Sequence, residues 1–308
     1  MILLWGLPND PPTASVRAAL AAASLPVAFV DQRATLETGV RLQLGDRLSG
    51  CMDIAGTTLD LESVTSAFVR PYDGSRLPAI ERLGPNTPAL SHTRRLERAL
   101  WLWAQYMPGL VVNRPSAMLR TTSKPYQLSM IRKAGFAVPE TLITTDPQAV
   151  DEFLGRHGTV IYKSISSMRS IVARLTESER GRFADVRWCP TQFQEYVPGV
   201  DFRVHVVGTE LFCCEIASEA VDYRYAGRQG ASIEMRPAVL PDECVKGCRQ
   251  LSAEVGLAVA GIDLRRTPDG AWFCFEINAS PAFSFFECTE AGSIAAAVAR
   301  LLAGGGLN

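Results

Sequence analysis

The chain has 308 residues, of which 47% are hydrophobic and 20% are charged, and its formal net charge at pH 7 is −1. That length is enough for about two domains with substantial cores. The near-neutral charge excludes a protein that binds nucleic acid through a basic field, so we predict no nucleic-acid partner. No stretch of 18 apolar residues occurs and the first residues lack a basic leader, so we expect a cytoplasmic protein without membrane contact.

Cysteine, histidine and lysine usage narrows the chemistry further. The eight cysteines show no Cys-x-x-Cys spacing and the three histidines are scattered, so neither a disulfide framework nor a zinc site is predicted. Most of the cysteines are expected to be small core residues. Only four of the 31 basic residues are lysines, which makes each lysine informative.

The first segment of the chain predicts a βαβ unit. A short apolar strand from Ile2 to Gly6 precedes an alanine-rich helix that runs to about Ser24, and a second strand spans Val27 to Asp31. The turn after the first strand is not a glycine-rich phosphate loop, so we place no nucleotide there. Further strands are predicted over Val40 to Leu44, Met52 to Leu61 and Ser66 to Arg70.

Two features of this segment leave alternatives open. Arg70, at the end of a strand, either faces a ligand or forms the salt bridge that is usual for an isolated strand-end arginine. A helix from Ser91 to Met107 carries Trp101 and Trp103, and such an aromatic stripe is typical of domain packing. If the two tryptophans are exposed, the same helix offers an interface for a homo-oligomer.

Two lysines lie where an anionic partner is expected. Lys124 is in the first turn of a helix that ends at Gly135, and the helix dipole disfavours a cation at that end. Lys163 ends an apolar strand that begins at Thr159, and burying an ammonium group is costly unless it is paired. For each lysine the alternatives are a nearby carboxylate and a bound phosphate.

Polar residues are sorted onto one face of a strand in the second half of the chain. Asp201, Arg203 and His205 alternate there with apolar residues. The irregular segment from Ser218 to Arg236 contains Arg224 and is typical of a loop that touches a ligand.

The stretch from Gly261 to Pro281 predicts a β-hairpin, because Pro268 and Gly270 suit a tight turn between two β-prone runs. If Thr267 pairs with Gly270, Asp263 lies opposite Cys274 and diagonal to Glu276. Side chains two apart then share a face. The predicted core face consists of Phe273, Phe275 and Ile277, and the opposite face consists of Asp263, Trp272, Cys274, Glu276 and Asn278.

Asp263, Glu276 and Asn278 would together present two carboxylates and an amide oxygen. Hard oxygen ligands of this kind suit Mg²⁺, with Mn²⁺ as an alternative metal. The other explanation is a solvated polar face. We favour the metal, because Trp272 and Cys274 would make the same face partly apolar and because other segments could hold the phosphates of a nucleotide.

Several short motifs follow one another from Lys124 to the end of the chain, over more than half its length. They are Ser-Lys124-Pro, Val-Ile-Tyr-Lys163, Gln194-Glu195-Tyr196-Val197, Asp201-Phe-Arg203, Ala260-Gly-Ile-Asp263 and Glu276-Ile-Asn278-Ala-Ser-Pro. In this order the set resembles the ATP-grasp superfamily and, within it, the RimK-like carboxylate-amine ligases. The surroundings of Asn113-Arg-Pro and Thr141-Leu-Ile-Thr are similar, more weakly, to the peptide-maturing ATP-grasp ligases that make graspetide crosslinks.

The resemblance implies a fold of mixed α/β and α+β class with three modules. A βαβ-type N-terminal domain with its linker helix would span residues 1–112, a central lid subdomain residues 113–190, and a C-terminal subdomain with the metal site residues 191–308. ATP would be held between the two α+β lobes.

The resemblance also implies roles for individual residues. The nucleotide contacts would be Lys124 and Lys163 with the phosphates, Glu195, Tyr196 and Val197 with the adenine, and Asp201 with the ribose. The metal ligands would be Asp263, Glu276 and Asn278, which would hold two Mg²⁺ ions. The residues that stabilise an acyl phosphate or the carboxylate substrate would be Arg203 and Arg224.

One loop departs from the family pattern. The family usually has a glycine-rich loop after the second lysine, whereas this chain reads Ser-Ile-Ser-Ser-Met-Arg169-Ser after Lys163. Backbone amides can still cradle phosphate, although residues other than glycine adopt positive φ reluctantly. We expect Arg169 to compensate by its charge.

We therefore expect an ADP-forming ligase that joins a small carboxylic acid or amino acid to an amine through an acyl phosphate. Two alternatives stay open. One is a ligase that modifies side-chain carboxylates of a precursor peptide. The other is a nucleotide-binding module that no longer catalyses, which the missing glycines permit and the metal-ligand pattern opposes.

Overall fold

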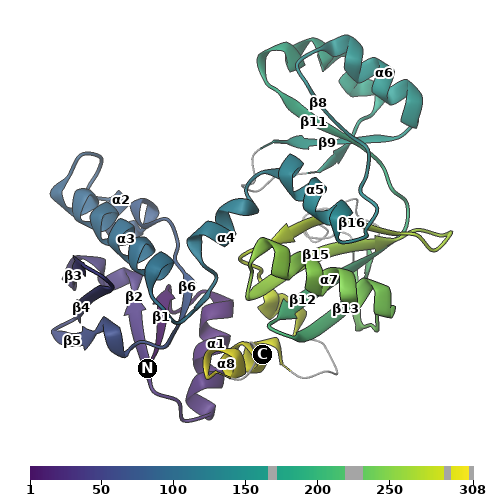
Figure 1. The fold of residues 1–308 in the computed structure, drawn as a ribbon. Helices are drawn as coiled ribbons and strands as arrows, with labels where there is room; N and C mark the ends of the chain where they lie inside the picture. Colours follow the sequence, from purple (N-terminus) through teal and green to yellow (C-terminus); the bar gives the residue numbers. More distant parts are fainter. Residues whose placement is uncertain (166–171, 219–231, 288–292, 305–308) are drawn as a thin grey trace.

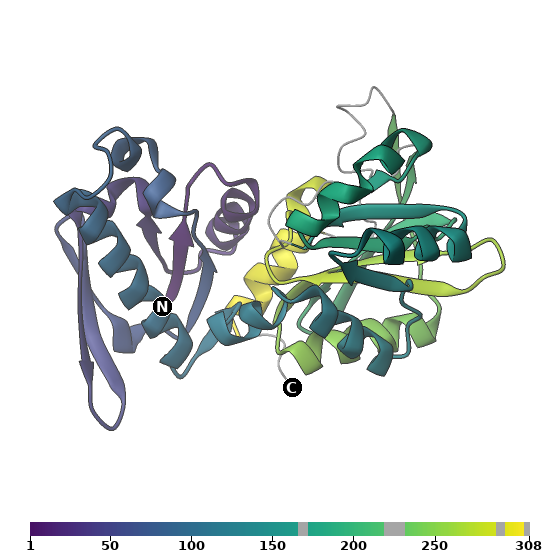
Figure 2. The ribbon, with the colours of Figure 1, turned by 90° about the horizontal axis from the view of Figure 1, so that it is seen from above.

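The computed structural model describes residues 1–165, 172–218, 232–287 and 293–304, and the chain folds into three modules (Figure 1). Figure 2 shows the N-terminal module beside the rest of the molecule, connected through α4 (Pro115–Arg120). In Figure 1 a small lid stands above a larger C-terminal module. No helix in these described ranges is long and apolar enough to cross a membrane.

The N-terminal module is built on a parallel sheet. In spatial order its strands are β2 (Val27–Asp31), β1 (Ile2–Gly6), β6 (Ser66–Arg70) and β7 (Leu110–Val112). The strand β1 is buried along its whole length, as an apolar strand in a parallel sheet should be. Between β1 and β2 the chain forms α1 (Pro11–Ala22), which Asp10 caps by accepting a hydrogen bond from the Thr13 amide at 3.1 Å. The predicted βαβ unit is confirmed.

A meander and a long helix complete this module. They are β3 (Thr38–Leu44), β4 (Leu48–Ile54), β5 (Thr57–Asp60), the short helix α2 (Pro78–Glu81) and α3 (Pro88–Tyr106). On α3, Trp103 is 3% exposed within the module core. Trp101 packs edge-on against Trp5, with ring centroids 5.0 Å apart. The expectation of exposed tryptophans is therefore wrong for Trp103, whereas Trp101 is partly exposed, and an oligomer interface on this helix stays a prediction.

The lid is a four-stranded antiparallel sheet. In spatial order its strands are β10 (Ala173–Arg174), β9 (Val160–Ser164), β11 (Thr191–Glu195) and β8 (Thr141–Thr144). One face is covered by α6 (Pro147–His157) and the 3₁₀ helix η4 (Glu177–Trp188), around a cluster that includes Phe153 and Phe193. The strand β11 lies beyond residue 190, where the sequence analysis ended the lid.

The C-terminal module is a five-stranded antiparallel sheet. In spatial order its strands are β14 (Ile233–Pro237), β13 (Glu210–Ser218), β12 (Val200–Val207), β15 (Val259–Arg266) and β16 (Trp272–Asn278). Its apolar face is covered by α7 (Asp242–Val255) and α5 (Lys124–Lys133), which share one core cluster with the strands. By packing, α5 therefore belongs to this module, although it precedes the lid in the chain.

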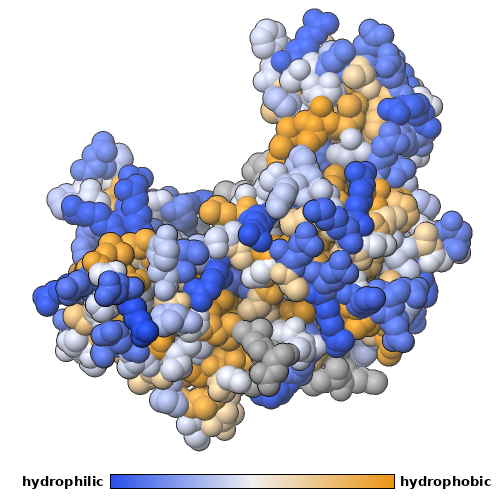
Figure 3. Space-filling model, viewed as in Figure 1, coloured by the Kyte–Doolittle hydropathy of each residue, from blue (hydrophilic) through white to orange (hydrophobic). Residues whose placement is uncertain are grey.

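The last helix joins the first and last modules. The helix α8 (Ile294–Leu302) and the 3₁₀ helix η6 (Phe283–Phe286) share a core cluster with α1 and with β12 and β13. Ser66 Oγ also donates to the Leu302 carbonyl oxygen at 2.6 Å. The N-terminal and C-terminal modules are thus packed on each other, and Figure 3 shows a recess between the N-terminal module and the lid.

Candidate active site

One face of the C-terminal sheet collects the side chains that the sequence analysis singled out. Asp263 of β15 lies directly opposite Glu276 of β16, and Asn278 follows two residues later on β16. Arg203 of β12 flanks Asp263 on the other side and donates from Nη1 to Asp263 Oδ1 at 2.5 Å. Asn278 Nδ2 donates to Glu276 Oε1 at 3.0 Å. The structure thus brings all four residues together, as predicted.

The hairpin reaches this arrangement by a register that differs from the predicted one. Gly270 has a φ of 93°. The Thr267 amide donates to the Ala271 carbonyl oxygen at 2.9 Å and Arg266 lies opposite Trp272, so the turn has one more residue than expected. A β-bulge next to Asp263 then shifts the pairing again, to Glu276. The predicted pairing of Asp263 with Cys274 is wrong, and the two carboxylates are closer neighbours than predicted.

The bulge also changes which side chains face the core. Cys274 and Ile277 are both buried in the cluster beneath the sheet, and Trp272 packs against that cluster. Phe275 lies on the polar face, where the guanidinium of Arg265 is 5.2 Å from its ring centroid. The predicted sorting is therefore wrong for Trp272, Cys274 and Phe275, and it is confirmed for Ile277.

The chemistry of this face fits a hard divalent cation. Two carboxylates and one amide oxygen are the donors that Mg²⁺ accepts when phosphates and water complete its coordination. Within the part of the chain that the structure describes, no group of three or more His, Cys, Asp or Glu side chains could hold a metal. The mixed set of Asp263, Glu276 and Asn278 is therefore the best candidate for the ligands.

Arg203 is positioned by two neighbours. Its side chain is buried, with the residue 6% exposed, and its Nε lies 3.4 Å from Nε2 of His205, which is 1% exposed. Burial and, secondly, the charge of Arg203 hold the pKa of His205 well below its ordinary value, so the ring is neutral and can accept that bond. A side chain at Gly261 would overlap the Arg203 guanidinium. Sequence reasoning missed Gly261, although a glycine inside a strand is a signal of such a close approach.

Asp201 is engaged by a second arginine on the same face. Arg265 pairs with it through two hydrogen bonds, Nε to Oδ1 at 2.7 Å and Nη2 to Oδ2 at 2.8 Å. Nη1 of Arg265 also donates to the Val197 carbonyl oxygen at 2.7 Å. The residue expected at the ribose is therefore tied to the segment expected at the adenine.

The lid contributes Lys163 from the face opposite α6. Lys163 Nζ donates to Gln194 Oε1 at 3.2 Å, and Gln194 Nε2 donates to Thr141 Oγ1 at 2.9 Å. Opposite Lys163 on β11, the oxygen Oε1 of buried Gln192 has no hydrogen-bond partner among the residues that the structure describes. An unsatisfied buried acceptor on this face is unusual in a folded protein.

Glu195 and Tyr196, two of the residues expected at the adenine, have side chains with different contacts. The carboxylate of Glu195 accepts the Glu140 amide at 2.8 Å and lies 3.6 Å from Nδ1 of His157. It is thus directed into the lid. The ring of Tyr196 lies under the guanidinium of Arg174, 4.3 Å from its centroid. The Glu195 amide also donates to the Glu140 carbonyl oxygen at 3.0 Å.

The helix α5 connects the other lysine to the hairpin. Lys124 is the first residue of α5, and buried Gln127 lies three residues later. Gln127 Oε1 accepts the Ile277 amide at 2.9 Å, and its Nε2 donates to the Thr121 carbonyl oxygen. The sequence analysis did not single out Gln127, because its partner amide lies 150 residues away.

Arg70 reaches the site from the N-terminal module. It forms the salt bridge that the sequence analysis offered as one alternative, from Nε to Asp10 at 2.8 Å. Its Nη1 also donates to Ser280 Oγ at 2.6 Å and to the Pro281 carbonyl oxygen at 3.1 Å. Ser280 and Pro281 lie two and three residues after Asn278, so Arg70 fixes the loop that follows the candidate metal site.

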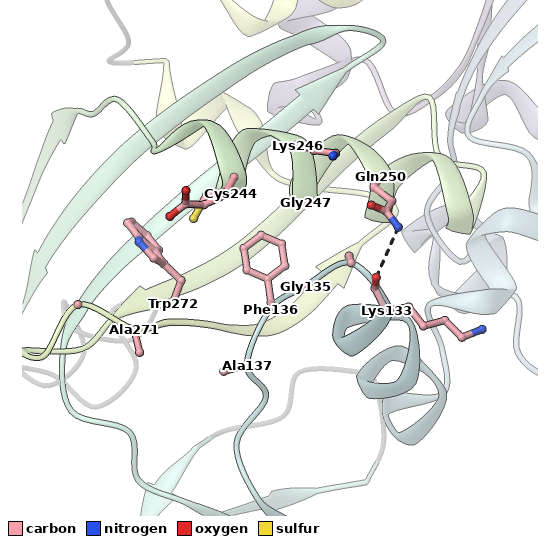
Figure 4. A pocket seen from close by; sticks show the side chains of 13 residues that line it. Lys133, Gly135, Phe136, Ala137, Cys244, Lys246, Gly247, Gln250, Ala271 and Trp272 are labelled. Atoms are coloured by element: carbon pink, nitrogen blue, oxygen red, sulfur yellow. Dashed lines mark hydrogen bonds between the residues drawn. The ribbon is translucent and has the colours of Figure 1, made fainter.

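Among the hollows bordered by described residues, two of the larger ones lie near these elements. One, of about 560 Å³, is bordered by Asn278 and by the apolar side chains of Trp101, Met118 and Leu119. The other, of about 620 Å³, lies between α7, the end of α5 and the hairpin turn, on the apolar side of the sheet. Figure 4 shows its lining residues, among them Phe136, Gln250 and Trp272. Only the first hollow shares a residue with the candidate site.

Two expected contributors cannot be placed. Arg224, with the centre of its segment, and Arg169, with most of the loop after Lys163, lie outside the described residues.

Comparisons with known proteins bear on the family and the fold of the chain. Residues 121–302 match a family model described as the RimK-like ATP-grasp domain. No curated protein matches the chain.

Three solved structures have a similar fold over nearly the whole chain. The macrocyclase MdnC from Microcystis aeruginosa MRC, bound with the precursor peptide MdnA, is 23% identical, with a TM-score of 0.83 and coverage of 98% of this chain and 99% of that chain. The ATP-grasp ligase PsnB, complexed with a phosphomimetic variant of its minimal precursor, Mg and ADP, is 25% identical, with a TM-score of 0.81 and coverage of 99% and 98%. A RiPP-associated ATP-grasp ligase from Chryseobacterium gregarium, in complex with ADP and a leader and core peptide, is 21% identical, with a TM-score of 0.82 and coverage of 98% and 96%.

Proposed function

Because the chain belongs to the RimK-like ATP-grasp family, we propose that it activates a side-chain carboxylate of a precursor peptide and joins it to an amine. The chain is an ATP-grasp ligase. The substrate class and the residue roles are the proposal. The observation that carries it is the pairing of Asp263 with Glu276 across two strands, with Arg203 beside them.

The proposed roles follow from charge and position. Lys124 and Lys163 would neutralise phosphate oxygens, and the main chain from Glu195 to Val197 would meet the adenine. Asp263, Glu276 and Asn278 would hold Mg²⁺, which supplies charge neutralisation on the phosphates when bound. The solved relative with a named metal contains magnesium, so we restrict the proposal to Mg²⁺.

The reaction needs positioning more than covalent catalysis. A carboxylate oxygen of the substrate attacks the γ-phosphorus of ATP, ADP leaves, and an acyl phosphate forms. The amine nitrogen then attacks the acyl carbon, inorganic phosphate leaves, and the nitrogen loses a proton. Arg203 is buried and already oriented by its neighbours, so it would stabilise the developing negative charge without reorganisation.

The peptide is preferred to a small acid, which the sequence analysis ranked first. This order is supported by the three similar structures named above, which cover nearly all of both chains and were solved with a precursor or its peptides bound. The 560 Å³ hollow beside Asn278 also offers room for side chains that flank the reacting carboxylate. A ligase for a small carboxylic acid or amino acid and an amine is the second candidate.

Incubation with ATP, Mg²⁺ and an acidic precursor peptide encoded beside the gene tests the proposal. We expect ADP release together with the loss of one water mass from the peptide for each bond formed. Parallel reactions contain free amino acids and amines in place of the peptide. ADP release with these alone would favour the second candidate, and no ADP release in any reaction would contradict the proposal.

A further inference from the structure

Gln127 is buried, and both the oxygen and the nitrogen of its side-chain amide form hydrogen bonds. The residue is 5% exposed, its Oε1 accepts the Ile277 amide at 2.9 Å, and its Nε2 donates to the Thr121 carbonyl oxygen. The reaction scheme above gives it no role. A buried amide of this kind constrains its surroundings strongly, because leaving either partner unpaired is costly.

The backbone amide of Ile277, which donates to Gln127, lies between two of the proposed metal ligands. The side chain of Ile277 is buried in the core, so its neighbours Glu276 and Asn278 point to the opposite face. The position of the Ile277 backbone therefore sets the position of both oxygen donors. The adjoining β-bulge interrupts the regular pairing next to Asp263, so this stretch receives less support from the sheet itself.

The Gln127 side chain also links β16, which carries two proposed metal ligands, to α5, which begins at Lys124. Gln127 lies three residues after Lys124 in α5, which is less than one turn. Movement of β16 relative to α5 would therefore separate the proposed metal ligands from a proposed phosphate ligand.

We infer that Gln127 is a positioning residue that sets the Mg²⁺ requirement of the site by holding Glu276 and Asn278 through the Ile277 amide. This inference rests on the proposed function, because it takes those residues as metal ligands. Gln127 itself contacts backbone groups and acts through them.

The chain offers two controls for a purely structural role. Gln32, in the N-terminal module, is 4% exposed; its Oε1 accepts the Tyr72 amide at 2.7 Å and its Nε2 donates to the Tyr72 carbonyl oxygen at 2.9 Å. Gln250 of α7 donates from Nε2 to the Lys133 carbonyl oxygen at 3.4 Å, at the opposite end of α5 (Figure 4). The first matches Gln127 in burial and bonding, and the second acts on the same helix.

The experiment is a titration of Mg²⁺ at fixed ADP, followed by calorimetry, with the full chain and the variants Gln127→Met, Gln32→Met and Gln250→Met. We expect Gln127→Met to raise the half-saturating Mg²⁺ concentration about tenfold. Its affinity for ADP without Mg²⁺ should stay at the wild-type value. The two control variants should keep the wild-type Mg²⁺ requirement, whatever their melting temperatures.

Each other outcome has a definite meaning. A Mg²⁺ requirement of folded Gln127→Met within about twofold of wild type would overturn the inference, and so would an equal rise in Gln32→Met. If Gln127→Met does not fold, Gln127→Glu, which keeps an oxygen for the Ile277 amide, is titrated instead. It should stay near wild type, and about a tenfold rise would overturn the inference. Wild-type protein that binds ADP without any effect of Mg²⁺ would instead contradict the proposed metal site.

Discussion

The guanidinium of Arg203 lies against the backbone of Gly261, which has no side chain to obstruct it. The same guanidinium pairs with Asp263 and bonds to the neutral ring of His205. A single hydrogen atom at position 261 is thus a condition for the orientation of Arg203. The sequence motif around Asp263 contains this glycine, and the reason for it becomes visible only when β12 and β15 are paired.

We predict that Gly261→Ala keeps the fold and slows ADP formation about 10- to 100-fold. The added methyl group would overlap the Arg203 guanidinium and would also lie 2.8 Å from Cβ of Pro281, so both side chains must shift. We expect the changed orientation of Arg203 to slow the reaction and the shift at Pro281 to lower the melting temperature. ADP release with saturating Mg-ATP and substrate, measured beside the melting temperature, checks this. In α6, Gly155→Ala adds a methyl group in open space and should leave ADP release unchanged. Wild-type turnover in Gly261→Ala would mean that the position of Arg203 does not limit the reaction.

The hairpin of β15 and β16 shows what an alternating sequence pattern can predict and what it cannot. Alternation placed Asp263, Glu276 and Asn278 on one face, which is confirmed. It could not predict the bulge, because Cys274 and Ile277 are three residues apart and both belong to the core. A regular strand would send them to opposite faces. The need for the bulge therefore arises from packing against α5 and α7, which are distant in the sequence.

The interface between α7 and the sheet contains buried thiols, in agreement with the expectation that most cysteines are core residues. Burial raises the pKa of Cys213 to about 12 and that of Cys244 to about 11. Burial likewise raises the pKa values of Cys248 and Cys274. All four are free thiols within one core cluster.

We predict that this interface makes the protein sensitive to alkali. The folded state keeps these thiols protonated, whereas in the unfolded chain they ionise above the ordinary thiol pKa of 9.0. The free energy of unfolding should therefore fall as pH rises above 9.0, by up to about 1.4 kcal/mol per pH unit for each thiol. Urea unfolding at several pH values from about 8 to about 11 measures how steeply the free energy of unfolding falls with pH.

Two substitutions isolate the thiols from other groups that ionise in the same range. Cys213→Ala removes one buried thiol and should make the fall with pH shallower. Cys189→Ala removes an exposed thiol and should leave the slope as it is in wild type. If the Cys213→Ala and wild-type slopes coincide, the buried thiols do not account for the alkaline loss.

For the molecule as a whole, Asn113 joins the N-terminal module to the catalytic sheet. Its Nδ2 donates to the carbonyl oxygens of Val259 and Ala279 at 2.7 and 2.6 Å. Its Oδ1 accepts the amides of Ala258 and Val259 at 2.9 and 3.1 Å. These bonds fix both strands of the β15–β16 hairpin at the end nearest the N-terminal module.

We predict that Asn113→Ala lowers the free energy of unfolding by about 3 kcal/mol or more, because it leaves several buried backbone groups unpaired. Thermal unfolding should show a lower midpoint. It should also show a first transition for the separated module, if Asn113 is the main tie between modules. Asn9→Ala, an exposed asparagine of the same module, is the control. A single transition at the wild-type midpoint would contradict this role of Asn113 and would leave the contacts of α8, η6 and Arg70 as the ties between the modules.

The pattern of apolar residues predicted the βαβ unit and the polar face of the hairpin, and the order of the motifs predicted the mixed α/β class and the two later lobes. It could not predict what holds these parts together. The partners of Asn113 and Gln127 lie about 150 residues away in the chain, and nothing in the local pattern marks an amide side chain as a tie. The extent of the lid was misjudged for a similar reason, because β11 joins the lid sheet through pairing with β8 and β9.

The central claim is that Glu276 belongs to a Mg²⁺-dependent nucleotide site. Thermal unfolding with and without Mg-ATP, for wild type and Glu276→Gln, tests it most directly, and Glu62→Gln on the N-terminal module provides a charge-matched control. At about 100 times Kd the nucleotide should stabilise wild type and the control by about 2.7 kcal/mol. Glu276→Gln should unfold like wild type without nucleotide and should lose most of the stabilisation by Mg-ATP. An equal shift in all three proteins would contradict the metal site and the function built on it.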